Sequence, residues 1–72
     1  MPIHQLMQAA AFDAAAVKII TTAFDDALRE LVLDRTDPKA EMVARKVIEC
    51  ARMGERDPGR LRDLAVAAVR DP

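Results

Sequence analysis

One cysteine and one histidine are the side chains of this sequence best suited to nucleophilic or acid–base chemistry. Cys50 is the only thiol, His4 is the only imidazole, and the chain has no serine. A nucleophile needs a base within hydrogen-bond reach, and these two residues lie far apart in the sequence. Cys50 falls at the edge of an apolar stripe, where a small half-buried thiol is ordinary. We therefore expect Cys50 to be structural, with a reactive thiol as the alternative, and His4 to be solvated or to contact a partner.

Carboxylates offer a second kind of chemistry. Asp25, Asp26 and Glu30 lie close together with Arg29 among them. A metal site needs His, Cys or carboxylate ligands that converge on one point, and a site between helices draws further acids from the facing helices. The chain has two glycines, too few for a glycine-rich phosphate loop. We therefore expect a solvated charged face, no metal, no cofactor and no enzymatic activity.

The segment 52–62 suggests a different activity, because it holds four arginines in a helix–turn–helix-like setting. A DNA-reading helix presents polar side chains in its first turns, and only Arg60 and Arg62 qualify here. The formal net charge is −1, from 11 basic and 12 acidic residues, whereas nucleic-acid binders usually carry a basic excess. A small DNA-associated regulator is therefore the alternative function, and a plain interhelical loop is the preferred interpretation.

Length and composition limit the scaffold that holds these groups. The chain has 72 residues, which is one small domain, 1–72. Hydrophobic residues make up 51%, but 14 of them are alanine, so we expect a thin core. A single cysteine fits a reducing compartment. No basic leader region and no apolar run of about 18 residues is present, so we expect a cytoplasmic protein without a membrane partner.

Prolines and glycines divide the chain into helices. Asp-Pro pairs at 37–38 and 57–58 are typical helix starts, since Asp caps the helix and proline suits its first position. Asp13 is an N-cap of the same kind, and Gly54 is a natural left-handed end. The sequence therefore predicts an all-α three-helix bundle with helices at about 13–34, 38–53 and 58–70. Residues 1–12 form an apolar arm or a short helix that packs either on its own bundle or on a partner.

Apolar residues recur at helical spacing and predict the core face of each helix. For the first helix the stripe is Val17, Ile20, Phe24, Leu28 and Leu31. For the second it is Ala40, Val43, Ala44, Val47, Ile48 and Ala51. For the third it is Leu61, Leu64, Ala65, Ala68 and Val69.

Several large apolar side chains do not fit these stripes. On the second helix, Met42 and Met53 lie roughly opposite Val47 and Ala51. Scattered exposed apolar residues are one explanation, but a small domain with a thin core also gains stability from pairing. We therefore expect a homodimer with twofold symmetry. The candidate interface residues are Leu6, Met7, Phe12, Ile19, Phe24, Leu33, Met42, Met53 and Val66.

Two short segments resemble parts of known proteins. MQAAAFD at residues 7–13 and GERDP at residues 54–58, followed by Leu61, resemble segments of small all-helical bacterial proteins with no known activity. The resemblance implies a compact helical fold and carries no ligand or functional residue with it. The expected function is therefore a non-enzymatic, self-associating helical protein that acts through protein–protein contacts in an accessory or regulatory role. A ligand pocket or an enzyme subunit formed at a dimer interface is a third possibility.

Overall fold

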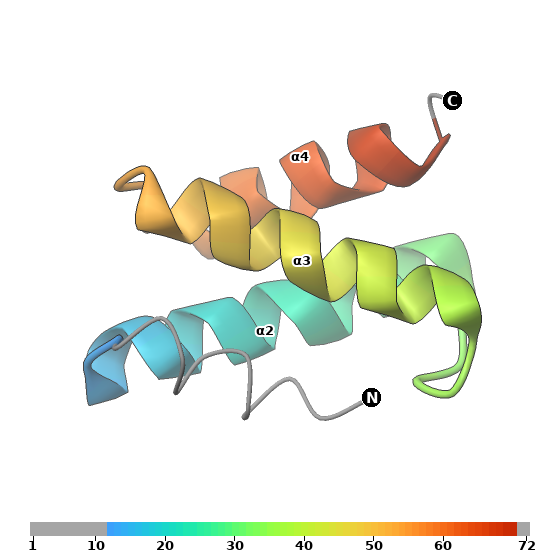
Figure 1. Cartoon of the computed structure of the whole chain (residues 1–72), viewed down its shortest axis with the longest axis horizontal. Coiled ribbons are helices and arrows are strands. Elements are labelled where there is room, and N and C mark those ends of the chain that lie inside the picture. Colours follow the sequence, from blue (N-terminus) through green and yellow to red (C-terminus); the bar gives the residue numbers. More distant parts are fainter. Residues whose placement is uncertain (1–11, 71–72) are drawn as a thin grey trace.

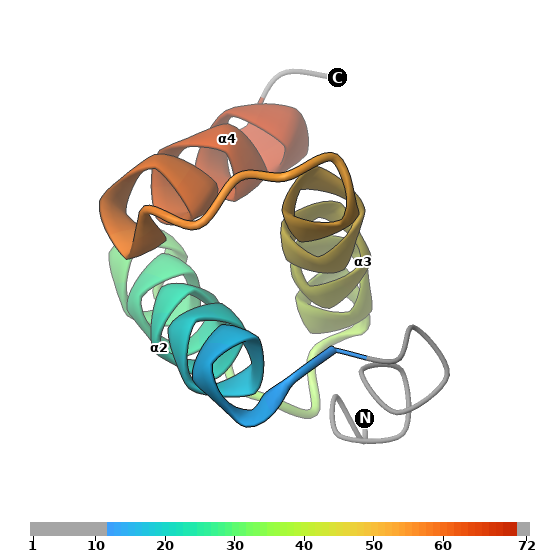
Figure 2. The same cartoon turned by 90° about the vertical axis from the view of Figure 1, so that its left-hand side faces the viewer.

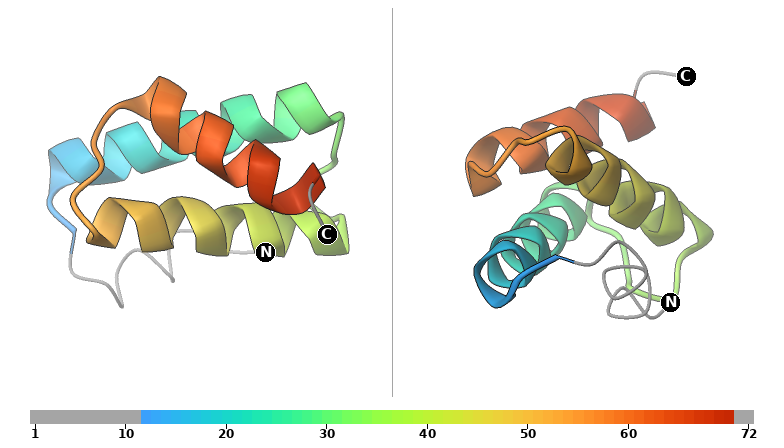
Figure 3. Two further views of the ribbon diagram at one scale, coloured as in Figure 1. Left: turned by 90° about the horizontal axis from the view of Figure 1, so that it is seen from above. Right: turned by 60° about the vertical axis from the view of Figure 1, so that its left-hand side comes forward.

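Three helices make up the fold. A computed structural model describes residues 12–70 of the chain, in which the helices are α2 (Ala14–Leu31), α3 (Pro38–Arg52) and α4 (Pro58–Arg70). In Figure 1, α2 and α3 lie along the length of the molecule. Each helix packs against the other two around a common centre (Figure 2), and α4 runs obliquely across the other pair (Figure 3). The predicted all-α three-helix bundle is confirmed for these residues.

All three helices begin directly after the aspartates that the sequence predicts, and at the start of α4 the Gly59 amide donates to the Asp57 carboxylate at 3.3 Å. The Ala16 amide donates to the Asp13 carboxylate at 2.7 Å, which caps α2. The Lys39 amide donates to the Asp37 carboxylate at 2.9 Å, and Pro38 occupies the first turn of α3. Each carboxylate satisfies an otherwise unpaired N–H group and lies at the positive end of a helix dipole. All three predicted helix starts are therefore confirmed.

The end of α2 differs from the prediction, which placed it near residue 34. α2 ends at Leu31 because Val32 adopts a left-handed conformation, with φ 55° and ψ 47°. The Leu33 amide donates to the Leu28 carbonyl at 2.9 Å, and the Val32 amide donates to the Arg29 carbonyl at 3.3 Å. This pair of bonds is a Schellman motif. The reversal brings Leu33 into contact with the core, which explains why the helix stops there.

Glycine ends α3 as the sequence predicts. Gly54 has φ 107°, a conformation that a side chain would strain. The Gly54 amide donates to the Ala51 carbonyl at 3.0 Å, and the Glu55 amide donates to the Cys50 carbonyl at 3.2 Å. These bonds satisfy two carbonyls at the end of the helix.

The core consists of small and medium-sized side chains. All six residues of the predicted α3 stripe are buried, which confirms that stripe in full. α2 buries Ile20, Phe24 and Leu28 as predicted and adds three alanines, Ala16, Ala23 and Ala27. Among residues 12–70 no polar or charged residue is buried. Because so much of the packed surface is alanine, the helices approach closely but each contact buries little apolar area.

The buried face of α4 agrees with the prediction only in part. Leu61 and Ala65 are buried as predicted, and Val69 is partly buried against the core. Val66 is buried although it was not predicted to be, whereas Ala68 is exposed and Leu64 is only half-buried. At about 100° per residue, this face is turned toward Val66 compared with the predicted stripe. α4 packs against both α2 and α3, and turning in this direction places a valine in the core where the prediction placed an alanine. The larger side chain removes more apolar surface from water.

Candidate functional site

The residues that could do nucleophilic or metal chemistry do not form a site in the described part of the chain. Cys50 is a free, half-buried thiol packed against the core. It borders a surface hollow with Met53 and Leu64. Among residues 12–70, no three His, Cys, Asp or Glu side chains lie close enough to hold a metal ion. His4 lies outside the described residues.

The predicted charged face on α2 pairs with neighbouring side chains. Arg29 lies 3.3 Å from the Asp26 carboxylate, and Arg35 of the α2–α3 loop pairs with Asp25. The Arg35 guanidinium also lies 6.0 Å from the centre of the Phe24 ring. These are exposed ion pairs, which contribute little to stability individually. The arrangement is a solvated charged surface rather than a pair of carboxylates aimed at one point.

Three of the four arginines between residues 52 and 62 have partners within the chain. Arg56 donates to the backbone carbonyls of Ala51 and Glu55. Its guanidinium lies 5.5 Å from the centre of the Phe12 ring. Arg56 therefore neutralises the negative end of α3 and connects it to the residue that precedes the α2 cap.

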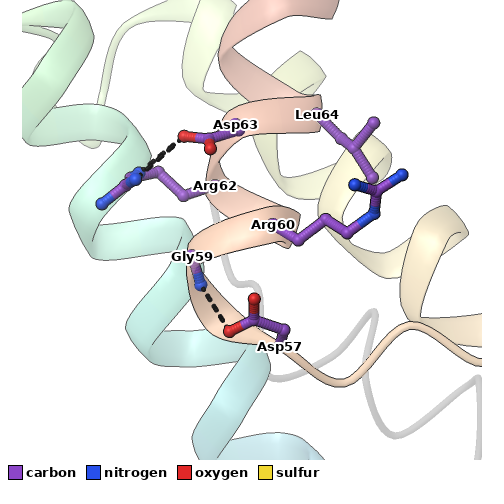
Figure 4. Close-up of a pocket in the computed structure, with 6 residues that line it drawn as sticks. All are labelled: Asp57, Gly59, Arg60, Arg62, Asp63 and Leu64. Atoms are coloured by element: carbon purple, nitrogen blue, oxygen red, sulfur yellow. Dashed lines mark hydrogen bonds and ion pairs between the residues drawn. The ribbon is translucent and has the colours of Figure 1, made fainter.

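The other two paired arginines lie on α4. Arg60 lies 2.8 Å from Glu55, and Arg62 lies 2.9 Å from Asp63. Figure 4 shows Arg60 and Leu64 on one side of α4 and Arg62 with Asp63 on another. The hydrogen bond from Arg62 to Asp63 raises the pKa of Arg62, and the charges of Asp63 and of two α2 carboxylates add to this effect. Arg60 and Arg62 border one open hollow together with Asp57 and Asp63 (Figure 4), so the basic groups there are matched by carboxylates, and Arg52 and Arg56 are not part of its lining.

The candidate interface residues fall into three groups. Met42 and Met53 are exposed, at 54% and 82% of their surface. Phe12, Ile19 and Leu33 are partly buried against the core of their own chain. Phe24 and Val66 are buried, at 2% and 7% exposure, so their inclusion as interface candidates is corrected here. Both side chains pack in the core between the helices and have little free surface to offer. Leu6 and Met7 lie outside the described residues.

Val32 is an exposed apolar residue that the sequence did not single out. It is 89% exposed in the loop after α2. Because the predicted first helix runs to residue 34, Val32 was expected to lie inside that helix, and its exposed side chain was not foreseen. A glycine or asparagine at this position would have signalled the left-handed end, and valine gives no such signal.

The two exposed methionines lie on one line along α3 and the cap residue that follows it, here called the methionine face: Met42, Lys46 and Glu49 of α3, and Met53 directly after its end. At about 100° per residue, these four residues fall within an arc of about 60° on the helix. Lys46 and Glu49 lie between the methionines, with their charged atoms 3.8 Å apart. At about 1.5 Å per residue, Met42 and Met53 are separated by about 16 Å along the helix. The opposite face of α3 is the completely buried stripe.

Comparison with protein-family models, with curated proteins and with solved structures finds no match to this chain. The resemblance to small all-helical bacterial proteins therefore stays a prediction. No helix in the described part of the chain combines the length and apolar character needed to cross a membrane.

Proposed function

We propose that this protein is a non-enzymatic helical protein that self-associates as a homodimer and acts through protein–protein contacts in an accessory or regulatory role. The observation that carries the proposal is the exposure of Met42 and Met53 on one face of α3. Single exposed apolar residues are common on monomers. Here two long apolar side chains share one line of a helix whose other side is fully buried.

The composition of the core supports the same proposal. Of the 15 buried hydrophobic residues among residues 12–70, seven are alanine, and Phe24 is the one aromatic side chain. Domains of this size rarely reach comfortable stability on such a core alone, and oligomerisation is one common remedy. Methionine suits a contact surface because its flexible, polarisable side chain adapts to the shape of the partner.

A DNA-associated function is not favoured by any observation on the arginine segment. Arg56, Arg60 and Arg62 already pair within the chain, so binding phosphates would require them to exchange partners. The sequence also lacks the basic excess that drives non-specific DNA binding.

The proposal is tested by measuring molar mass with light scattering on a size-exclusion column at increasing loading concentrations. We expect the mass to rise from 7.9 kDa toward twice that value as concentration increases. A mass that stays at the monomer value up to millimolar loading would overturn the proposal.

A further inference from the structure

We propose that the methionine face of α3 is a self-complementary surface that pairs antiparallel with the same face of a second copy. In this arrangement Met42 contacts the partner's Met53, and Lys46 faces the partner's Glu49. The inference rests on the proposed function, which states only that the chain self-associates. It adds the surface, the orientation and the register of the contact.

The positions of the four residues carry the argument. Met42 and Met53 lie at equal distances along the sequence on either side of one midpoint, which falls between residues 47 and 48. Lys46 and Glu49 are symmetric about the same midpoint. A twofold axis through that point and perpendicular to α3 places each methionine opposite the other methionine of the second copy. Twofold dimers use the same patch on both copies, so a surface that forms one must be complementary to itself. The methionine face has this property in the antiparallel orientation.

Charge decides between the two possible orientations. Antiparallel pairing places each Lys46 opposite a Glu49 of the second copy, which is attractive at both places. Parallel pairing in register places Lys46 against Lys46 and Glu49 against Glu49, and like charges across an interface are costly. The side chains of Lys46 and Glu49 are 37% and 64% exposed, so both can reach a second copy.

The size of the surface sets the expected affinity. α3 has 15 residues, and only one of its faces is free. A contact made by one face of a single helix buries less area than a standard stable interface. Such small interfaces are typical of weak and transient complexes. We therefore expect a dissociation constant in the micromolar range or weaker, with monomer and dimer in exchange.

Exchanging charges tests the register directly. Lys46→Glu gives a face with two acidic residues, and Glu49→Lys gives a face with two basic residues. We expect each variant alone to dimerise at least about tenfold more weakly than the wild type, because like charges then oppose each other across the axis. Mixed together, the two variants should form a heterodimer of near wild-type affinity, since every opposing pair is again attractive. Sedimentation velocity on the separate and mixed variants measures both effects.

Matched controls separate this local effect from a change in overall charge. Lys18→Glu and Glu30→Lys make the same charge changes at exposed positions of α2. These controls should dimerise like the wild type, and mixing them should give no preference for the heterodimer. A preference equal to that of the α3 variants would overturn the proposed register.

Disulfide trapping tests the orientation. In a Cys50→Ser background, Met42→Cys and Met53→Cys each introduce one thiol on the methionine face. Antiparallel pairing predicts that Met42→Cys protein crosslinks rapidly to Met53→Cys protein under mild oxidation and only slowly to itself. Rapid crosslinking of the Met42→Cys variant to itself indicates parallel packing and overturns the inference.

These experiments distinguish failure of the inference from failure of the proposed function. A wild-type chain that sediments as a monomer at every concentration overturns both. A wild-type dimer that responds to neither the charge variants nor the cysteine pair keeps the self-association and removes α3 as its surface.

Discussion

Replacing Val32 with glycine should stabilise the protein, because Val32 holds a backbone conformation that glycine adopts more easily. Val32 has φ 55° and ψ 47° and terminates α2 through the hydrogen bonds of its own amide and the Leu33 amide. A β-branched residue is uncommon in this left-handed region because its Cβ crowds the backbone. The Val32 side chain is 89% exposed, so removing it loses little packing.

The expected gain is the difference between two effects. A residue with a side chain costs about 1–2 kcal/mol in the left-handed conformation relative to the right-handed one. The unfolded chain is more flexible with glycine at this position, and the entropy lost on folding offsets the gain by about 0.5–1 kcal/mol. We therefore expect Val32→Gly to raise the free energy of unfolding by about 0.5–1 kcal/mol, which corresponds to a rise in Tm of about 3–6 °C for a domain of this size.

Thermal and urea denaturation followed by circular dichroism at 222 nm measure this gain. The protein concentration must be held constant, since self-association itself adds to the apparent stability. Val32→Ala serves as the control: it shortens the side chain but keeps the Cβ, so it should gain less than Val32→Gly. If Val32→Gly lowers the Tm, then the left-handed conformation of Val32 is not a source of strain and the reasoning fails.

Three further predictions concern a helix cap, the alanine core and DNA. Asp37→Ala should lower the free energy of unfolding by about 1 kcal/mol in urea denaturation, because the Lys39 amide loses its acceptor, whereas an unchanged midpoint would contradict the capping role. Ala44→Leu should cost about 1–3 kcal/mol, since Ala44 is 0% exposed and a larger side chain must displace its neighbours; wild-type stability would show that the core has spare room. In a gel-shift assay at low salt, random duplex DNA should not bind at micromolar protein, and a salt-sensitive shift would revive the DNA-associated function.

Local signals predicted α3 completely. Its Asp-Pro start, its buried stripe and the glycine after its end agree with one another, so every local preference favours the same structure. The orientation of α4 depended instead on packing against two helices at once. Leu61 and Ala65 suit either rotation of α4, and only the space between α2 and α3 selects Val66 over Ala68. A single-helix pattern contains no information about that space.

The candidate site was predicted less evenly than the fold. The exposure of Met42 and Met53 followed from their place opposite the α3 stripe, because the two faces of a helix are linked by geometry. Val32 was missed because a valine does not signal the left-handed conformation that it adopts before Leu33 packs against the core. Phe24 was an interface candidate although it belongs to the core stripe, and its burial follows from the contact of α2 with both other helices.

The central claim is that this chain self-associates through the methionine face, and one sedimentation experiment tests it most directly. The intact wild type and a Met42→Lys/Met53→Lys double variant are compared over the same series of concentrations. We predict that the wild type rises from 7.9 kDa toward twice that mass, while the double variant stays at 7.9 kDa with an unchanged helical circular dichroism spectrum. Equal masses for the two proteins at every concentration would contradict the claim.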